Sequence, residues 1–330
     1  MVSLADPYRA KPYALDRDTA PAFWLVGTLW LPMATGVQTA NRLALLEQHM
    51  PTGLGPPAHF HPTDEGFYVL EGEVTFKAAG QSHQAGPGGF VHLPRLTPHT
   101  FTVESETARV LNFYTPAGFE MILMSVAKLA PERRRPTKEE APMPPPEQVF
   151  ILSKLFGMEQ VAMMPFAGRP TEAVMATEPS TASLLPPHVS GTATAPAFSA
   201  FGLAWQLLAG SVDTGGAYNL FELSIPAGAR FGAWVHAQDQ ALYVLEAGAQ
   251  VLLDDRIIEA KAGTFVFVPA GVVNAVRAGA DGARLLMLHL PGALDRAVAG
   301  LGGEASADGG RLRDYLDAIG TRAVAAPGGW

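Results

Sequence analysis

The sequence predicts an all-β protein built from two tandem barrels or sandwiches, because short apolar runs, frequent turn residues and an internal repeat occur together. The runs are rich in Val, Phe, Tyr and Leu, as in Phe67 to Leu70, Phe90 to Leu93 and Phe265 to Val268. Many of the 34 Gly and 28 Pro residues of the 330-residue chain separate such runs. Short strands with turn signals at this spacing are typical of β-barrels and β-sandwiches.

The internal repeat divides the chain into two halves. The segment Tyr68-Val69-Leu70-Glu71 recurs as Tyr243-Val244-Leu245-Glu246, at an offset of 175 residues. The same offset relates Trp30 to Trp205, Gly53 to Gly228, His61 to His236, Asp64 to Asp239, Gly88 to Gly263, Pro94 to Pro269, Arg109 to Arg284 and Pro116 to Pro291. One barrel is therefore predicted at residues 25–120 and its copy at 200–295, within domains 1–165 and 166–330.

Short helices are predicted to flank the barrels. Residues 120–129, 147–157 and 311–319 have helical patterns, and a glycine lies at or directly after the end of the last two. The segment 131–146 is rich in Pro and charge, and the segment 166–198 is rich in Pro, Thr, Ala and Ser. We interpret these two segments as connections.

Composition excludes several classes of function. The net charge of −8 argues against nucleic-acid binding, and the basic run Arg133 to Arg135 is interpreted as a solvated loop. The absence of cysteine excludes disulfides, thiolate catalysis and iron–sulfur clusters. No apolar run reaches the ~18 residues that span a bilayer, and the N-terminus lacks the apolar stretch of a signal peptide. A cytoplasmic protein that does not bind membranes is therefore expected.

The first barrel contains a pattern of candidate metal ligands. It reads Gly53-x5-His59-x-His61-x3-Glu65-x6-Gly72, followed by Gly88-x5-Pro94-x4-His99. Side chains alternate along a strand, so His59 and His61 are expected to face the same side. A turn lets the next strand begin with Glu65 facing inward, and a third strand brings His99 across the barrel.

Three imidazoles and one carboxylate would form a mixed nitrogen and oxygen site. Such a site suits Fe, Mn, Ni, Co or Cu better than Mg or Ca. Burying four such groups without a partner would be costly, which favours metal binding over a purely structural role. The sequence leaves the identity of the metal open.

These motifs resemble the two signature motifs of the cupin superfamily. The first motif matches at every defining position, whereas the second has Leu96 and Val103 where Gly and Asn are usual. Neither departure concerns a ligand. The resemblance implies a bicupin, with two tandem double-stranded β-helix (jelly-roll) barrels and short flanking helices.

The second barrel lacks most of the ligand pattern. At the same offset, Trp234 replaces His59, Gln240 replaces Glu65 and Asn274 replaces His99, so that His236 alone is kept. We interpret this copy as structural or as an interface. The histidines outside the motifs, His49, His83, His188 and His289, are interpreted as surface or structural residues.

A narrower resemblance concerns quercetin 2,3-dioxygenase-type cupins. It rests on the segments Tyr13 to Trp30, Gly53 to His59, Glu65 to Glu73 and Thr115 to Glu120, and on the Pro-rich connection that follows. It implies a flavonol dioxygenase in which O2 adds both atoms, the central ring opens and carbon monoxide leaves. His59, His61 and His99 would be ligands, and Glu65 would be both a ligand and the proton acceptor.

The substrate pocket is predicted less directly. By alternation, Phe67 shares the face of Glu65, and Phe101 shares the face of His99. Two phenyl rings near the metal would suit a flat aromatic ligand, although both also fit an ordinary barrel core. His92 lies on a neighbouring predicted strand and is a further candidate for the pocket wall.

Two other functions remain open at the level of the sequence. One is another metal-dependent cupin enzyme, such as an isomerase or cyclase acting on a polar or polyketide-like substrate. The other is a non-catalytic bicupin that binds a small molecule. The expected partners of the dioxygenase are an aromatic small molecule and O2. The oligomeric state stays open between two barrels packed within one chain and a homodimer.

The contrast between the barrels predicts one divalent transition metal per chain. Elemental analysis of purified protein should give a ratio near one, because only the first barrel keeps the carboxylate and three imidazoles. A ratio near two, with metal bound at His236, would contradict this assignment.

Overall fold

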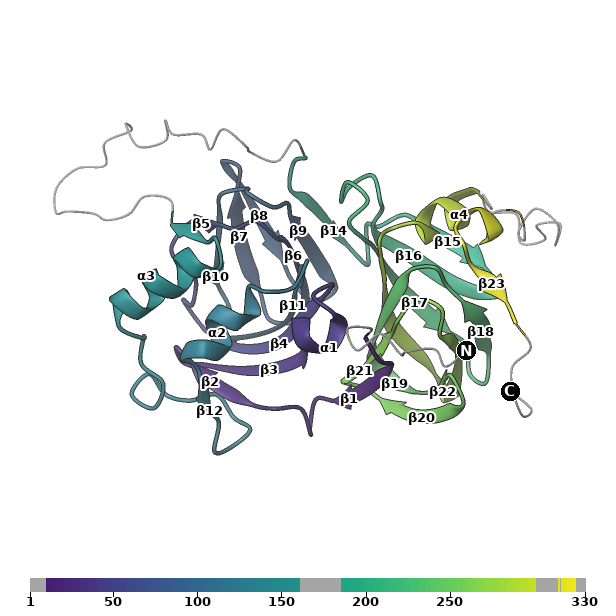
Figure 1. Ribbon diagram of the computed structural model, residues 1–330, viewed down its shortest axis with the longest axis horizontal. Helices are drawn as coiled ribbons and strands as arrows, with labels where there is room; N and C mark the ends of the chain where they lie inside the picture. Colours follow the sequence, from purple (N-terminus) through teal and green to yellow (C-terminus); the bar gives the residue numbers. More distant parts are fainter. Residues whose placement is uncertain (1–9, 161–184, 301–313, 315, 325–330) are drawn as a thin grey trace, which may run out of the picture. The chain divides into compact units, whose positions relative to one another are not determined.

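The computed structural model describes residues 10–160, 185–300, 314 and 316–324. The chain divides into two units, and the prediction of an all-β protein with short helices is confirmed (Figure 1). Of the described residues, the N-terminal barrel comprises 21–36, 41–160 and 185–191, and the C-terminal barrel comprises 10–20, 37–40, 192–300, 314 and 316–324. The helices are α1 (Gly36–Thr39), α2 (Glu120–Val126), α3 (Pro146–Leu155) and α4 (Leu294–Gly300).

The N-terminal barrel consists of two antiparallel sheets. The larger sheet has the order β12 (Lys128–Leu129), β2 (Phe23–Leu25), β3 (Thr28–Ala34), β4 (Ala44–Pro51), β11 (Thr107–Thr115), β6 (Asp64–Glu71), β9 (Gly89–Leu93) and β14 (His188–Gly191). The smaller sheet has the order β13 (Glu159–Gln160), β5 (His59–Phe60), β10 (His99–Val103), β7 (Val74–Ala78) and β8 (Gln81–Ala85). Helices α2 and α3 lie side by side against this barrel (Figure 1).

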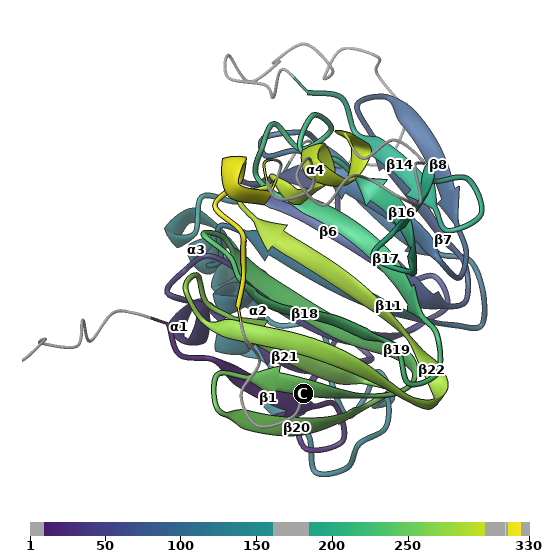
Figure 2. The same cartoon turned by 90° about the vertical axis from the view of Figure 1, so that its right-hand side faces the viewer.

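The C-terminal barrel is one connected antiparallel sheet. Its main path is β1 (Tyr13–Asp16), β21 (Thr264–Val268), β19 (Asp239–Leu253), β22 (Val273–Leu290), β17 (Asn219–Ile225), β16 (Leu203–Ala209) and β15 (Ala197–Ala200). Strand β18 (Arg230–Val235) pairs with β22 and β23 (Arg322–Ala323), and β20 (Arg256–Lys261) pairs with β19. Figure 2 shows β1 beside β21 in this barrel.

Alternation along the strands builds the core of each barrel. On β6, Phe67 and Val69 enter the apolar core of the N-terminal barrel together with Val91 and Leu93 of β9. Residues two apart on a strand share a face, so Glu65 belongs to the same inward-facing row. The C-terminal barrel buries a larger apolar cluster that includes Trp205, Phe221 and Phe231.

The two barrels repeat the same local hydrogen bonds. The indole nitrogen of Trp30 donates to the Leu25 carbonyl at 3.2 Å, and that of Trp205 donates to the Ala200 carbonyl at 3.0 Å. One carboxylate oxygen of Asp64 accepts a bond from the Arg95 backbone N–H at 2.8 Å. Asp239 accepts the equivalent bond from Ala270, also at 2.8 Å. These shared residues support the fold of both copies.

Leu96 occupies a backbone conformation that usually favours glycine. Its φ is +62°, and the residue at the matching position of the second barrel, Gly271, has a φ of +83°. Leu96 donates its backbone N–H to the His61 carbonyl at 2.8 Å, and Gly271 donates its backbone N–H to the His236 carbonyl at the same distance. The motif departure at Leu96 therefore leaves the turn geometry intact.

The unit boundaries differ from the predicted division at residue 165. Strand β1 pairs with β21 and so belongs to the C-terminal barrel, whereas β14 pairs with β9 of the N-terminal barrel. Each of these strands covers a strand that would otherwise present unpaired backbone groups at a sheet edge. Sequence order could not show this exchange, because hydrogen bonds between distant strands leave no local pattern.

The helices also differ in part from their predicted ranges. Helix α2 ends at Val126, because residues 128–129 pair as β12 with β2. Helix α3 agrees closely with the predicted range 147–157. Of the predicted helix 311–319, residues 314 and 316–318 are helical, whereas residues 311–313 and 315 lie outside the described residues. Within the described part of the chain, no helix is both long and apolar enough to cross a membrane.

The repeated aspartate predicts a stability effect that is independent of metal. Asp239→Ala removes a buried acceptor and leaves the Ala270 N–H without its partner, so unfolding free energy should fall by about 1–3 kcal/mol. Urea denaturation of metal-free protein measures the change. The exposed Asp281→Ala is the control and should stay within about 0.5 kcal/mol of wild type. Equal stability of Asp239→Ala and wild type would contradict the structural role.

Candidate metal centre

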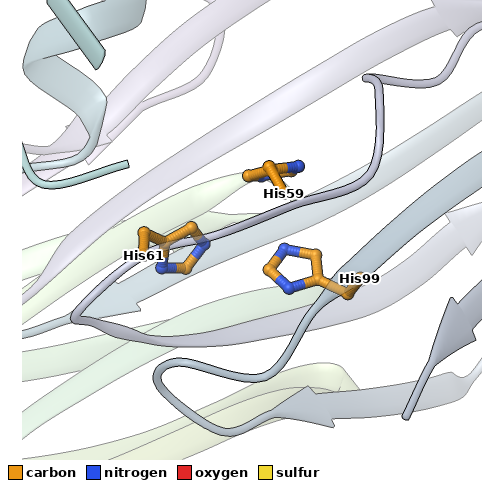
Figure 3. Close-up of side chains that lie close together, drawn as sticks. All are labelled: His59, His61 and His99. Atoms are coloured by element: carbon orange, nitrogen blue, oxygen red, sulfur yellow. The ribbon is translucent and has the colours of Figure 1, made fainter. Parts of the chain in front are cut away.

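Three of the four predicted ligands meet in the interior of the N-terminal barrel. His59 lies on β5, His61 directly follows β5, and His99 begins β10, where it is the cross-strand partner of His59. One ring nitrogen from each histidine lies within 4.8 Å of the others, and all three side chains are buried. Figure 3 shows the three rings gathered around one point. Among the described residues, they are the one such group of three.

Backbone carbonyls fix the orientation of each ring. The Nδ1 of His59 lies 2.9 Å from the Pro57 carbonyl, and the Nδ1 of His99 lies 2.8 Å from the Thr97 carbonyl. The Nδ1 of His61 lies 2.9 Å from both the carbonyl and the hydroxyl oxygen of Thr63. A carbonyl can only accept, so each Nδ1 is the N–H donor and each neutral ring presents its Nε2 lone pair.

Glu65, the fourth predicted ligand, adjoins this group from β6. Its Oε2 lies 3.2 Å from the Nε2 of His61 and 2.9 Å from the Nε2 of His99. Its other oxygen, Oε1, accepts a hydrogen bond of 2.9 Å from the side-chain amide of Asn112. The carboxylate is therefore held with one oxygen toward the histidines and one toward the barrel wall.

Burial and mutual contact change the acidity of these groups. Burial, together with the neighbouring charge of His99, lowers the pKa of His59 to about 3. Burial alone would raise the pKa of Glu65, but hydrogen bonds from His61 and His99 outweigh it and hold that pKa well below its usual value. At neutral pH, Glu65 is thus ionised and His59 is neutral, the form in which a histidine can bind a metal ion.

This arrangement requires a cation. When Nδ1 carries the proton of a neutral ring, the Nε2 lone pairs of His61 and His99 face Oε2 of Glu65 at 3.2 and 2.9 Å and repel it unless a positive charge lies between them. A proton shared with Glu65 or a metal ion would relieve the repulsion. Three nitrogens and one carboxylate oxygen fit a divalent transition metal such as Mn or Fe.

A cavity of about 200 Å³ opens from this site within the N-terminal barrel. His59, Glu65 and His99 form its polar end, and both predicted aromatic residues, Phe67 and Phe101, lie in its wall. The rest of the wall is largely apolar and comprises Leu25, Val26, Trp30, Leu54, Gly55, Pro56, Pro57, Phe119, Ile122, Leu123, Val126, Met143, Pro144, Val149 and Met158. Gln48, Asn112 and Gln160 add polar side chains.

His92, the third predicted pocket residue, does not line this cavity. It pairs with Gly66 on β6, whereas the neighbouring residue Leu93 pairs with Glu65. Because side chains alternate, Leu93 shares the inward face with Glu65, and His92 points to the opposite face of the sheet. The prediction that His92 forms part of the pocket wall is therefore wrong.

Four residues near the site were not predicted from the sequence. Tyr114 is the cross-strand partner of Glu65 and hydrogen-bonds its carboxylate; burial and this carboxylate raise the pKa of Tyr114 well above its usual value. Phe119 packs against His61, with 4.6 Å between the ring centroids. Gln48 and Asn112 are buried amides on β4 and β11. Polar residues inside otherwise apolar strands were the available signal.

The C-terminal barrel retains a polar cluster at the equivalent place. Trp234 pairs with Asn274, and Gln240 pairs with His289 across strands, with 3.1 Å between the Gln240 amide nitrogen and the His289 Nε2. His236 lies beside His289, with 5.1 Å between ring centroids. His289 lies outside the motifs in the sequence, but the fold places it in this cluster, at the position that matches Tyr114 at the repeat offset. No carboxylate replaces Glu65 in this cluster.

Comparisons with known proteins agree with this architecture. The profile of a family described as Cupin domain matches residues 46–114. Quercetin 2,3-dioxygenase of Bacillus subtilis is 22% identical over 302 residues, which cover 90% of this chain and 87% of that protein. Dimethylsulfoniopropionate lyase DddQ of Ruegeria pomeroyi is 37% identical over 65 residues, covering 19% of this chain and 32% of that protein.

Similarity to solved structures extends over both barrels. Oxalate decarboxylase of Bacillus subtilis, in a structure concerned with its Mn(II) centres, has a TM-score of 0.59 and 13% identity. The superposition covers 97% of this chain and 91% of that chain. At this level of identity the similarity concerns the fold.

The buried histidine of the C-terminal barrel predicts a pH effect on stability. Burial lowers the pKa of His236 to about 4, whereas an unfolded histidine titrates near 6.5. Between these values the unfolded state binds a proton that the folded state does not. Stability is therefore complete above about pH 6.5 and decreases as the pH falls toward 4, by about 3 kcal/mol in total from this group.

His236→Gln removes this titration. The slope of unfolding free energy against pH, measured by urea denaturation between pH 4.5 and 6.5, should decrease by up to about 1.4 kcal/mol per pH unit. At pH 7 to 8 the two proteins should have the same slope, which serves as the control. Equal slopes in the acidic range would contradict a neutral buried His236.

Proposed function

We propose that this protein, whose residues 46–114 are a cupin domain within a bicupin fold, is a metal-dependent dioxygenase that cleaves a flavonol-like aromatic enol with O2. The carrying observation is that the His59, His61, His99 and Glu65 cluster forms the polar end of an otherwise apolar, aromatic-lined cavity. A planar aromatic molecule with one anionic oxygen fits both ends of such a cavity. Similarity along the chain to quercetin 2,3-dioxygenase supports this choice of substrate class.

Different residues of the site would bind the metal, accept the proton and orient the substrate. A divalent transition metal held by the three histidines and Glu65 would supply a Lewis acid that favours the ionised form of a substrate hydroxyl. Glu65 accepts the proton of that hydroxyl, and Tyr114 and Asn112 hold the carboxylate in place through hydrogen bonds. The apolar wall, including Phe67 and Phe101, orients the rings and excludes water.

The proposed reaction needs no external reductant. The flavonol supplies the electrons, two carbon–carbon bonds of its central ring break, and both oxygen atoms of O2 enter the cleaved ester product. The carbon between the broken bonds leaves as carbon monoxide with its own oxygen. One flavonol and one O2 therefore give one ester and one CO.

Oxygen uptake with a panel of flavonols and related enols tests this function. Metal-loaded protein should consume one O2 and release one CO per flavonol. The matched control is the protein stripped of metal. Metal-loaded protein that consumes no O2 with any member of the panel would exclude the dioxygenase.

A metal-dependent lyase is the second candidate. The local 37% identity with dimethylsulfoniopropionate lyase DddQ over 65 residues favours it, and so does the hydrogen bond between Glu65 and Tyr114, since a carboxylate beside a phenol can remove a proton from carbon. This reaction would form product without O2. Anaerobic product formation therefore distinguishes the lyase from the dioxygenase.

Glu65→Gln should separate metal binding from proton transfer. Glutamine keeps the size and one oxygen, and the C-terminal barrel already carries Gln240 at the matching position, so the variant should fold and retain metal on the three histidines. Turnover should fall by about 10²–10⁴-fold, the usual contribution of a general base. Glu65→Ala should lose metal more severely, as shown by elemental analysis. Wild-type turnover in fully loaded Glu65→Gln would exclude the proton-acceptor role.

A further inference from the structure

Three side chains form a hydrogen-bonded chain along the wall of the cavity. The side-chain nitrogen of Gln48 donates to the Asn112 side-chain oxygen at 2.8 Å. The Asn112 side-chain nitrogen donates in turn to Oε1 of Glu65 at 2.9 Å. All three residues are buried, and all three line the cavity.

The polarity of this chain follows from its two ends. An ionised carboxylate can only accept, so Asn112 must turn its NH2 group toward Glu65. The same NH2 group lies 3.4 Å from the backbone carbonyl of Gly66, which is also an acceptor only. The oxygen of Asn112 therefore faces Gln48, and Gln48 must present its own NH2 group to it.

This polarity leaves the carbonyl oxygen of Gln48 as an unused acceptor. The residue is 1% exposed, and its Oε1 has no hydrogen-bond partner among the described residues. An unsatisfied buried acceptor costs about 1–3 kcal/mol, and the surrounding wall is mostly apolar. The geometry thus favours a ligand that brings a hydrogen-bond donor to this position.

The second barrel shows that the fold does not require these amides. At the repeat offset of 175 residues, Leu223 matches Gln48 and Met287 matches Asn112. Both are buried in the apolar core of the C-terminal barrel. At these two positions, amides accordingly occur only in the barrel that also has the histidine and glutamate cluster.

We propose that Gln48 determines substrate specificity by accepting a hydrogen bond from a ring hydroxyl of the substrate, other than the hydroxyl that loses its proton to Glu65. This inference rests on the proposed flavonol function and narrows its substrate class to polyhydroxylated flavonols. Asn112 is a positioning residue, since it orients Gln48 at one end and Glu65 at the other.

The test compares ligand binding by wild type, Gln48→Leu and Gln48→Met. Metal-loaded protein is titrated without O2 with 3-hydroxyflavone, which has no further ring hydroxyl, and with galangin, kaempferol and quercetin, which have increasing numbers. Leucine is the residue of the matching position in the second barrel, and methionine is nearly isosteric with glutamine. Metal content and circular dichroism confirm that each variant is folded and loaded.

Wild type should bind at least one polyhydroxylated flavonol roughly tenfold more tightly than 3-hydroxyflavone, and both variants should lose this preference while they retain affinity for 3-hydroxyflavone. Equal weakening for all four ligands would show that Gln48 is merely structural and would overturn the inference. An unchanged preference in the variants would also overturn it, with the flavonol function intact. Failure of wild type to bind any flavonol would instead overturn the proposed function and this inference with it.

Discussion

The hydrogen bonds from three imidazole Nδ1 atoms to backbone carbonyls are the interactions on which the site depends. They turn His59, His61 and His99 so that the three Nε2 atoms converge, and they do so without using any other side chain except Thr63. Two of these nitrogens then lie against the carboxylate of Glu65. Only a cation can stabilise this arrangement of lone pairs and negative charge. The ligand set, the ionised state of Glu65 and the position of the cavity all follow from this backbone control.

The C-terminal barrel shows what the same backbone does without those ligands. It keeps the buried aspartate, the tryptophan hydrogen bond and the turn after its histidine, so the frame is independent of metal. Its interior still buries polar side chains, including His236, but Gln240 stands at the position that matches Glu65. Duplication has thus separated the requirements of the barrel from those of the chemistry.

Along the cavity wall, a short chain of hydrogen bonds connects the candidate metal centre to Gln48, the residue proposed to recognise the substrate. Gln48, Asn112 and Glu65 come from β4, β11 and β6, which are neighbours in one sheet although up to 64 residues separate them along the sequence. Because the carboxylate at one end can only accept, the direction of every hydrogen bond in the chain is determined. Glu65, which would take a proton from one substrate hydroxyl, thereby also determines that Gln48 presents its carbonyl oxygen to a second substrate hydroxyl.

The sequence by itself determined the all-β class, the duplication and the four candidate ligands, because alternation along a strand and a constant repeat offset are local properties of the chain. The tertiary structure decided what depends on pairing between distant strands. That pairing put His92 on the outer face, brought Tyr114 to Glu65 and His289 to Gln240, and exchanged β1 and β14 between the two barrels. Cross-strand register arises from backbone hydrogen bonds that any residue except proline can form, and it therefore leaves little trace in the sequence.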